Sequence, residues 1–102
     1  MKYDRSDDFK ADYKRLSERE KGLFKKSYLR MNDAYAQRGN QALPPWPKSL
    51  RIRDVEGATG VFEMTWSFSG PDGRATFEII TIAGSPAIRW RRIGGHEIFR
   101  AP

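Results

Sequence analysis

The chain has no cysteine and only one histidine among its 102 residues. It can therefore form no disulfide and no thiolate metal site, and it has no cysteine nucleophile. One imidazole cannot build a histidine-rich zinc site, so we expect neither a metal nor a cofactor. No run of about eighteen apolar residues is present, and the N-terminus lacks the apolar core of a secretory signal. We therefore expect a cytoplasmic protein without a membrane partner.

The length and the net charge indicate one small domain with an acidic partner. A chain of 102 residues can bury one modest core but not two, so we expect residues 1–102 to form a single domain. Nineteen Lys and Arg against thirteen Asp and Glu give a net charge of +6. This excess favours nucleic acid, an anionic membrane surface or an acidic protein as partner, and charge alone does not choose among them.

The first forty residues carry the pattern of two helices. Ser6 is followed by two aspartates, which is typical of an N-cap, and apolar residues then recur at intervals of four and three. Ser17 and Glu20 form a capping box, so we predict a second helix that begins there and ends near Gly39. The prolines of residues 43–47 then forbid both helix and strand pairing.

From residue 50 onward apolar and polar residues alternate, and this period of two predicts β-strands. The expected strands span residues 50–55, 62–68, 74–79 and 87–93, with a further candidate near residues 2–5. The predicted fold class is α+β, with two N-terminal helices packed on one face of a twisted antiparallel sheet of about four strands. The other face is predicted to be polar and solvent-facing, and it carries Glu63, Thr65, Ser67, Arg74, Glu78, Arg89 and Arg91.

A tight turn over residues 70–73 joins two of these strands. With Ser69 opposite Arg74, the turn predicts that Trp66 pairs with Phe77 on the core face. A slip of one residue would place these two aromatic rings in opposite environments, so the hydrophobic pattern supports this register.

The histidine stands close to several arginines at the strand ends. His96 follows a pair of glycines after an arginine-dense strand, and Arg74 opens another strand directly after the turn. An imidazole can give or take a proton near neutral pH, and a guanidinium matches the charge on the nonbridging oxygens of a pentacoordinate phosphorus. This constellation predicts chemistry on a phosphodiester.

Other charged residues of the polar face complete the candidate site. Glu63 or Glu78 could act as the base, or could orient His96 or pair with an arginine. The cations expected to contact RNA are Arg51, Arg53, Arg89, Arg91 and Arg92. Each assignment has a structural alternative: His96 as an ordinary loop residue, Arg74 in a surface ion pair, and the strand arginines as charges that protect an edge from aggregation.

The order of elements and the residues at the strand ends resemble the RelE/ParE superfamily of toxins from bacterial type II toxin–antitoxin modules. The resemblance covers nearly the whole chain, and no single piece of it is specific. The segments that carry it are the end of the first helix (residues 14–16), the strand opening at residues 73–75 and the closing residues 93–99.

For the RelE-like branch, the resemblance implies a ribosome-dependent mRNA endoribonuclease. The ribose 2′-OH attacks its own 3′-phosphate and leaves a 2′,3′-cyclic phosphate and a 5′-OH, while a basic surface holds the mRNA and ribosomal RNA. A cognate antitoxin blocks the site in a toxin–antitoxin heterocomplex. Arg74 stands at the position of the family's arginine that stabilises the transition state. His96 stands where members of the family carry the general acid that protonates the 5′-oxygen.

The chain departs from the family at three positions, which keeps other functions open. Glu63 and Thr65 stand where one branch has lysines, and Phe99 stands where a tyrosine is common, so it can stack on a base but donate no hydrogen bond. One alternative is a ParE-like toxin that poisons DNA gyrase, a branch that generally lacks the His/Arg constellation. Another is a non-catalytic RNA- or protein-binding member, and fold alone does not decide.

Overall fold

The computed structural model describes residues 1–67 and 72–102, and both helices begin where the sequence predicts. Helix α1 spans Asp7–Lys14, and the hydroxyl of its N-cap Ser6 accepts a hydrogen bond from the Phe9 N–H at 3.0 Å. Helix α2 spans Glu18–Ala36 and starts with the complete capping box, in which the two side chain–backbone hydrogen bonds are 2.8 and 3.1 Å long. These caps satisfy N–H groups that a helix cannot pair internally.

In the part of the chain that the structure describes, five strands form one mixed sheet in the order β1-β5-β4-β3-β2. They are β1 (Tyr3–Arg5), β2 (Arg53–Asp54), β3 (Val61–Ser67), β4 (Gly73–Ile82) and β5 (Ser85–Gly94). Strand β1 runs parallel to β5, and the other pairs are antiparallel. The α+β class is therefore confirmed, but the sheet has five strands rather than four and is not purely antiparallel. The difference arises because the N-terminal segment pairs with the last strand.

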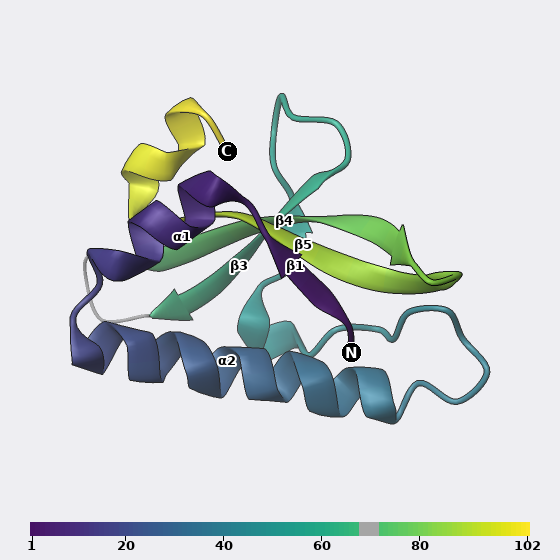
Figure 1. Ribbon diagram of the computed structural model, residues 1–102. Helices are drawn as coiled ribbons and strands as arrows, with labels where there is room; N and C mark the ends of the chain where they lie inside the picture. The colour runs from purple at the N-terminus through teal and green to yellow at the C-terminus, as the bar shows by residue number, and fades with distance from the viewer. Residues whose placement is uncertain (68–71) are drawn as a thin grey trace.

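The two faces of the sheet are covered by different elements (Figure 1). Helix α2 runs along one face, and the short 3₁₀ helix η2 (His96–Arg100) lies on the opposite side. We call the face toward η2 the second face. None of the helices in the described part of the chain is long and apolar enough to cross a membrane.

An aromatic core joins both helices to the middle of the sheet. The Trp90 ring of β5 lies 5.9 Å from Phe9 of α1, 5.1 Å from Phe24 of α2 and 5.3 Å from Phe77 of β4, measured between ring centroids. Because these rings are almost completely buried, they supply much of the apolar area removed from water. The periodicity of the sequence is confirmed here, since all four residues face the core as predicted.

The predicted pairing of β3 with β4 has the wrong register, but it assigns each side chain to the correct face of the sheet. Phe77 lies opposite Phe62 rather than Trp66, and Arg74 lies opposite Thr65. The slip is an even number of residues, so every side chain keeps its face of the sheet. Ser69, which the prediction placed opposite Arg74, lies outside the described residues, as do Phe68 and the first half of the predicted turn.

The strand predicted over residues 50–55 is mostly absent. Leu50 ends a 3₁₀ turn, η1 (Lys48–Leu50), and Arg51 has a positive φ of 49°. A residue in this left-handed conformation interrupts an extended strand, so that only the two residues of β2 pair with β3.

Gly73 opens β4 at a point where no larger residue fits. A Cβ built on Gly73 would lie 2.5 Å from the indole ring of Trp66, which is itself buried. We predict that Gly73→Ala lowers the free energy of unfolding by about 1–3 kcal/mol, because overpacking forces a buried ring out of place. Denaturant unfolding measures this loss. Gly22→Ala is the matched control, since a Cβ there meets nothing within 4 Å on α2 and should stabilise the protein slightly; an equal effect of the two would contradict the prediction.

The second face is polar, as predicted, but only part of it is open to solvent: Glu78, Arg89 and Arg91 are half-buried, and the rest of the face is buried. Its buried polar residues are Glu63, Thr65, Ser67, Arg74 and Thr76. The C-terminal segment covers this face: Ile98 of η2 is 1% exposed and lies against Gly94 of β5. The prediction failed because alternation of side chains along a strand says nothing about a later segment that folds over it.

Candidate functional site

Strand pairing brings the segments that carry Arg74 and His96 side by side. Arg74 lies directly opposite Gly94 in the β4–β5 ladder, and His96 begins η2 after Gly95. The Arg74 side chain is only 7% exposed. His96 is exposed, and its ring lies 5.7 Å from that of Phe99. The guanidinium of Arg74 is therefore buried, whereas the imidazole of His96 is at the molecular surface.

The protein uses only part of the hydrogen-bonding capacity of Arg74. One terminal nitrogen lies 3.3 Å from Asp72 Oδ2, and the other donates weakly to the Gly73 carbonyl at 3.4 Å. Its Nε and the hydroxyl of Thr76 on the same strand are buried without a partner among the described residues. Buried donors without partners are costly, so an anion that reached this guanidinium would gain strong, charge-assisted hydrogen bonds.

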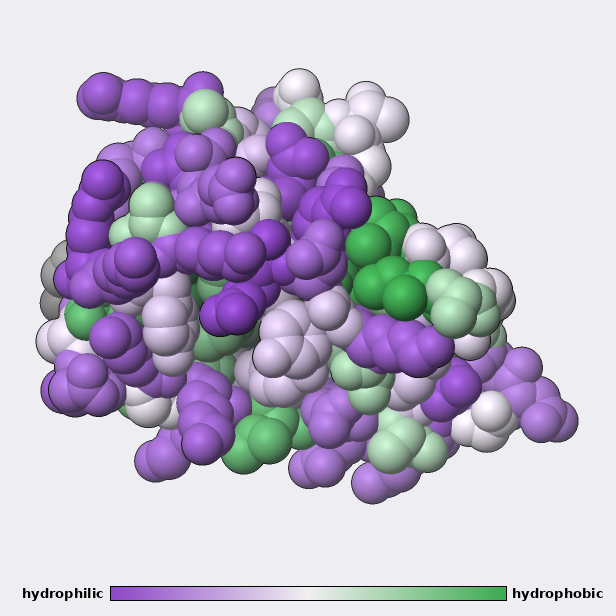
Figure 2. Space-filling view, viewed as in Figure 1, coloured by the Kyte–Doolittle hydropathy of each residue, from purple (hydrophilic) through white to green (hydrophobic). Residues whose placement is uncertain are grey.

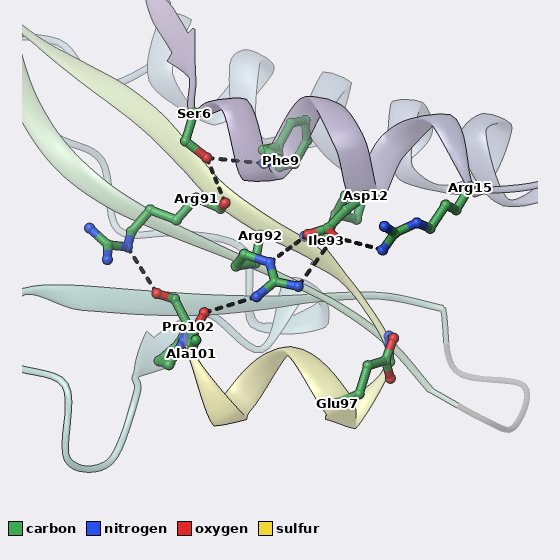
Figure 3. Close-up of polar contacts among 11 residues, drawn as sticks. Ser6, Phe9, Asp12, Arg15, Arg91, Arg92, Ile93, Glu97, Ala101 and Pro102 are labelled. Carbon is green, nitrogen blue, oxygen red and sulfur yellow. Dashed lines mark hydrogen bonds and ion pairs between the residues drawn. The ribbon is translucent and has the colours of Figure 1, made fainter.

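Glu97 fixes the turn that presents His96. Its Oε1 accepts a hydrogen bond from the Gly95 N–H at 3.0 Å, and its carboxylate lies beside the start of η2 (Figure 3). A Cβ on either Gly94 or Gly95 would approach this carboxylate to 2.7 Å, so the Glu97 side chain would have to move to admit a larger residue there. Hydrogen bonds from the backbone N–H groups of Gly95 and of Glu97 itself lower the pKa of the Glu97 carboxyl below its ordinary value of 4.5.

The lowered pKa of Glu97 predicts a pH-dependent contribution to stability. A depressed folded-state pKa means that the contribution is fully present above about pH 4.5 and is lost as the pH falls through the folded-state value. We expect Glu97→Gln to be less stable than the wild type at pH 6, and the difference to shrink toward pH 3. Urea unfolding at both values measures it, with the exposed Glu56→Gln as control. A difference that is constant with pH would contradict the assignment.

Glu78 lies between two of the predicted RNA-binding arginines. Its two oxygens pair with Arg89 at 3.4 Å and with Arg91 at 3.2 Å. Arg89 lies directly opposite Glu78, and Arg91 follows two residues later on the same strand, next to a β-bulge in the β4–β5 ladder. A pocket of about 540 Å³ opens here, lined by Glu78, Arg89, Arg91, Arg92 and the C-terminal residues, among others.

Glu63 and the cations near β2 lie toward the β2 edge of the sheet, away from β5. The Glu63 carboxylate is 2.7 Å from Nε of Arg53, its partner in the β2–β3 ladder. Arg51 is exposed just before β2. None of these three residues lines the pocket around Glu78.

Asp12 is a central residue of the site that sequence analysis missed. Its carboxylate accepts hydrogen bonds from Arg92 Nε at 2.6 Å, from a terminal nitrogen of Arg92 at 3.2 Å and from the Ile93 N–H at 3.2 Å (Figure 3). The hydrogen bond with Asp12 raises the pKa of the Arg92 guanidinium. A signal was present: Asp12 follows Phe9 by three residues and so falls on the buried stripe of α1.

The predicted RNA-binding residue Arg92 is thus also a structural residue. Besides Asp12, it donates to the Ala101 carbonyl at 3.2 Å, and the neighbouring Arg91 donates to Pro102 at 3.0 Å. Figure 3 shows these contacts as a chain that runs from α1 through β5 to the C-terminus. They hold the C-terminal segment across the second face. Among the described residues, no group of three or more His, Asp or Glu is arranged to hold a metal ion.

Comparison with known proteins adds information on the fold. The chain matches no protein-family model, and no curated protein sequence is significantly similar to it. Its structure is similar to a chain in the crystal structure of the RelB–RelE antitoxin–toxin complex from Methanococcus jannaschii, with a TM-score of 0.58 over 95% of this chain and 94% of that chain. The sequences are only 12% identical, so the likeness shows the fold alone. The protein therefore has a RelE-like α+β fold.

Proposed function

We propose that this protein is a RelE-like toxin that cleaves mRNA on the ribosome and is inhibited by a cognate antitoxin. The observation that carries the proposal is the pairing of Arg74 with Gly94 in the β4–β5 ladder. The buried Arg74, whose Nε has no hydrogen-bond partner among the described residues, therefore lies beside the end of β5, two residues before His96. The net charge of +6 favours an RNA substrate. The similar solved structure is an antitoxin–toxin complex, which supports an antitoxin as partner.

In the proposed reaction the 2′-oxygen forms a bond to its own 3′-phosphorus, and the bond from phosphorus to the 5′-oxygen breaks. A base takes the proton of the 2′-OH, and the His96 imidazolium gives its proton to the departing 5′-oxygen. Arg74 donates hydrogen bonds to the nonbridging oxygens as charge builds on them. No water is consumed in this step, and the products are a 2′,3′-cyclic phosphate and a 5′-OH.

The base in this proposal is a carboxylate that substrate binding releases. Glu63 and Glu78 are the carboxylates of the second face, and each is paired with arginine. An RNA phosphate that displaced the carboxylate from Arg89 and Arg91 would leave Glu78 free to accept a proton. The same arginines, with Arg92 and the ring of Phe99, would then hold the RNA backbone and a base.

Induction of the protein in growing cells, followed by primer extension on several mRNAs, tests the function. We expect growth arrest with cuts inside translated regions, and fragments that carry a 5′-OH and a cyclic phosphate. Arrest with intact mRNA and a DNA-damage response would contradict the nuclease and favour a ParE-like action on gyrase. Normal growth with RNA binding but no cuts would also contradict it.

The ion pairs of the second face favour a second candidate, a non-catalytic RNA- or protein-binding member of the fold. Arg53, Arg74, Arg89, Arg91 and Arg92 each contact a carboxylate, which reduces the positive charge available to a substrate there. This candidate predicts no toxicity and, if RNA is the ligand, an affinity that falls steeply as salt is raised.

A further inference from the structure

A second groove lies between β1 and α2, away from the face that carries Arg74. Its volume is about 240 Å³, and its lining consists of aromatic and basic residues: Tyr3, Arg5, Phe9, Tyr13, Phe24, Lys25, Tyr28 and Trp90. The surface between β1 and α2 is pale in Figure 2, while the surface over α1 is strongly hydrophilic. A groove of this size admits one planar ring group rather than a folded domain.

Two tyrosines form an open corner at this groove. The rings of Tyr3 and Tyr28 lie 5.6 Å apart with an interplanar angle of 70°. Tyr28 rests in turn on Trp90 of the core, with the ring centroids 6.3 Å apart, so its position is fixed. Tyr3 is 51% exposed, so about half of its side chain is open to a ligand. The corner therefore offers an aromatic face on which a planar ligand can stack without any rearrangement of the core.

Two cations with no ion-pair partner line the same groove. Among the described residues, neither the Arg5 nor the Lys25 side chain has a hydrogen bond, ion pair or ring contact. No acidic side chain lines the groove. By contrast, each of five second-face arginines contacts a carboxylate: Arg53, Arg74, Arg89, Arg91 and Arg92. The groove is therefore a site where positive charge is available to an anionic ligand.

We propose that this groove binds one nucleotide of single-stranded RNA, with its base stacked on Tyr3 and its phosphate at Arg5 and Lys25. Aromatic rings beside unpaired cations are the combination by which proteins hold single strands without reading sequence. An acidic peptide would satisfy the two cations but would leave the aromatic corner unused, so the nucleotide fits both features. The proposal does not require the cleavage described above, because it concerns binding at a separate site.

Binding of a short single-stranded RNA that contains 4-thiouridine tests the proposal, with His96→Ala as the background so that the RNA stays intact. We expect ultraviolet cross-links to Tyr3 or Tyr28 by mass spectrometry. Tyr3→Leu, which removes the ring, should weaken the affinity by roughly fivefold to a hundredfold, the range of one stacking contact. Tyr3→Phe, which keeps the ring, should bind like the parent.

The charge is tested with Arg5→Gln against Lys10→Gln, an exposed residue of α1 that does not line the groove. Only Arg5→Gln should reduce both the affinity and its salt dependence. Each variant is checked for an unchanged unfolding midpoint. If Arg5→Gln unfolds more easily than the parent, Lys25→Gln takes its place as the charge variant. Three results would each overturn the proposal. The cross-links could be confined to the second face, or Tyr3→Leu and Tyr3→Phe could bind RNA with equal affinity. The bound RNA could also be displaced by an acidic peptide but not by unlabelled RNA.

Discussion

Replacement of His96 by alanine is expected to reduce mRNA cleavage by about 10²–10⁴-fold, the usual contribution of a general acid. The free energy of unfolding should change by less than about 0.5 kcal/mol, because His96 is exposed and its one described side-chain contact is the ring of Phe99. Single-turnover cleavage on programmed ribosomes measures the first quantity, and denaturant unfolding measures the second.

The matched control for His96 is Phe99→Leu, which removes the same ring contact but leaves the imidazole in place. Because the ring of Phe99 is proposed to stack on a base, this variant should bind substrate more weakly, but it should keep most of the single-turnover cleavage rate at saturating ribosome concentration. Unchanged cleavage in His96→Ala would remove this residue from the mechanism, whereas equal losses in both variants would mark its role as structural.

Asp12→Ala is expected to lower the free energy of unfolding by about 2–4 kcal/mol. Removal of one partner of a buried ion pair leaves the other charge unpaired, which costs about 3–5 kcal/mol in fully buried cases. The Arg92 side chain is 23% exposed, so water recovers part of this cost. The Ile93 N–H also loses its acceptor, and α1 loses its polar link to β5. Denaturant unfolding with the slope held fixed measures the change.

Two further variants separate the role of Asp12 from a general effect on charge. Asp33→Ala removes an exposed carboxylate from α2 and should change stability by less than about 0.5 kcal/mol. Asp12→Asn keeps an acceptor for the Ile93 N–H but loses the negative charge, so its cost should fall between the two. If Asp12→Ala were as stable as Asp33→Ala, the network in Figure 3 would contribute nothing to folding.

The helices show where sequence alone was sufficient. Ser6, Ser17 and Glu20 act within three residues of their partners, so the physics that starts each helix is contained in a short segment. The end of α2 was less certain: it stops at Ala36 rather than near Gly39, because no comparably strong local signal marks that end. The aromatic side of each strand was likewise predictable from its period of two.

The candidate site shows where sequence was not sufficient. Arg74 and His96 were singled out by residue type and resemblance, but neither the burial of Arg74 nor the glycine opposite it follows from the pattern. The strand pairing depends on a loop and a bulge whose geometry alternation does not encode. The arginines on the strands were chosen as RNA contacts before their partners were known, and those partners come from α1, β1, β3 and β4.

By itself the sequence determined the helix starts, the side that each strand turns to the core, the basic charge and the α+β class, since each depends on neighbours in the chain or on composition. Only the tertiary structure decided the strand partners, the tail that closes the second face, and the contact between Asp12 and Arg92, which lie 80 residues apart. Contacts over such a separation form when packing selects one arrangement among many that share the same local pattern. The open aromatic corner with its unpaired cations belongs to this second group, because it exists only where β1 meets α2.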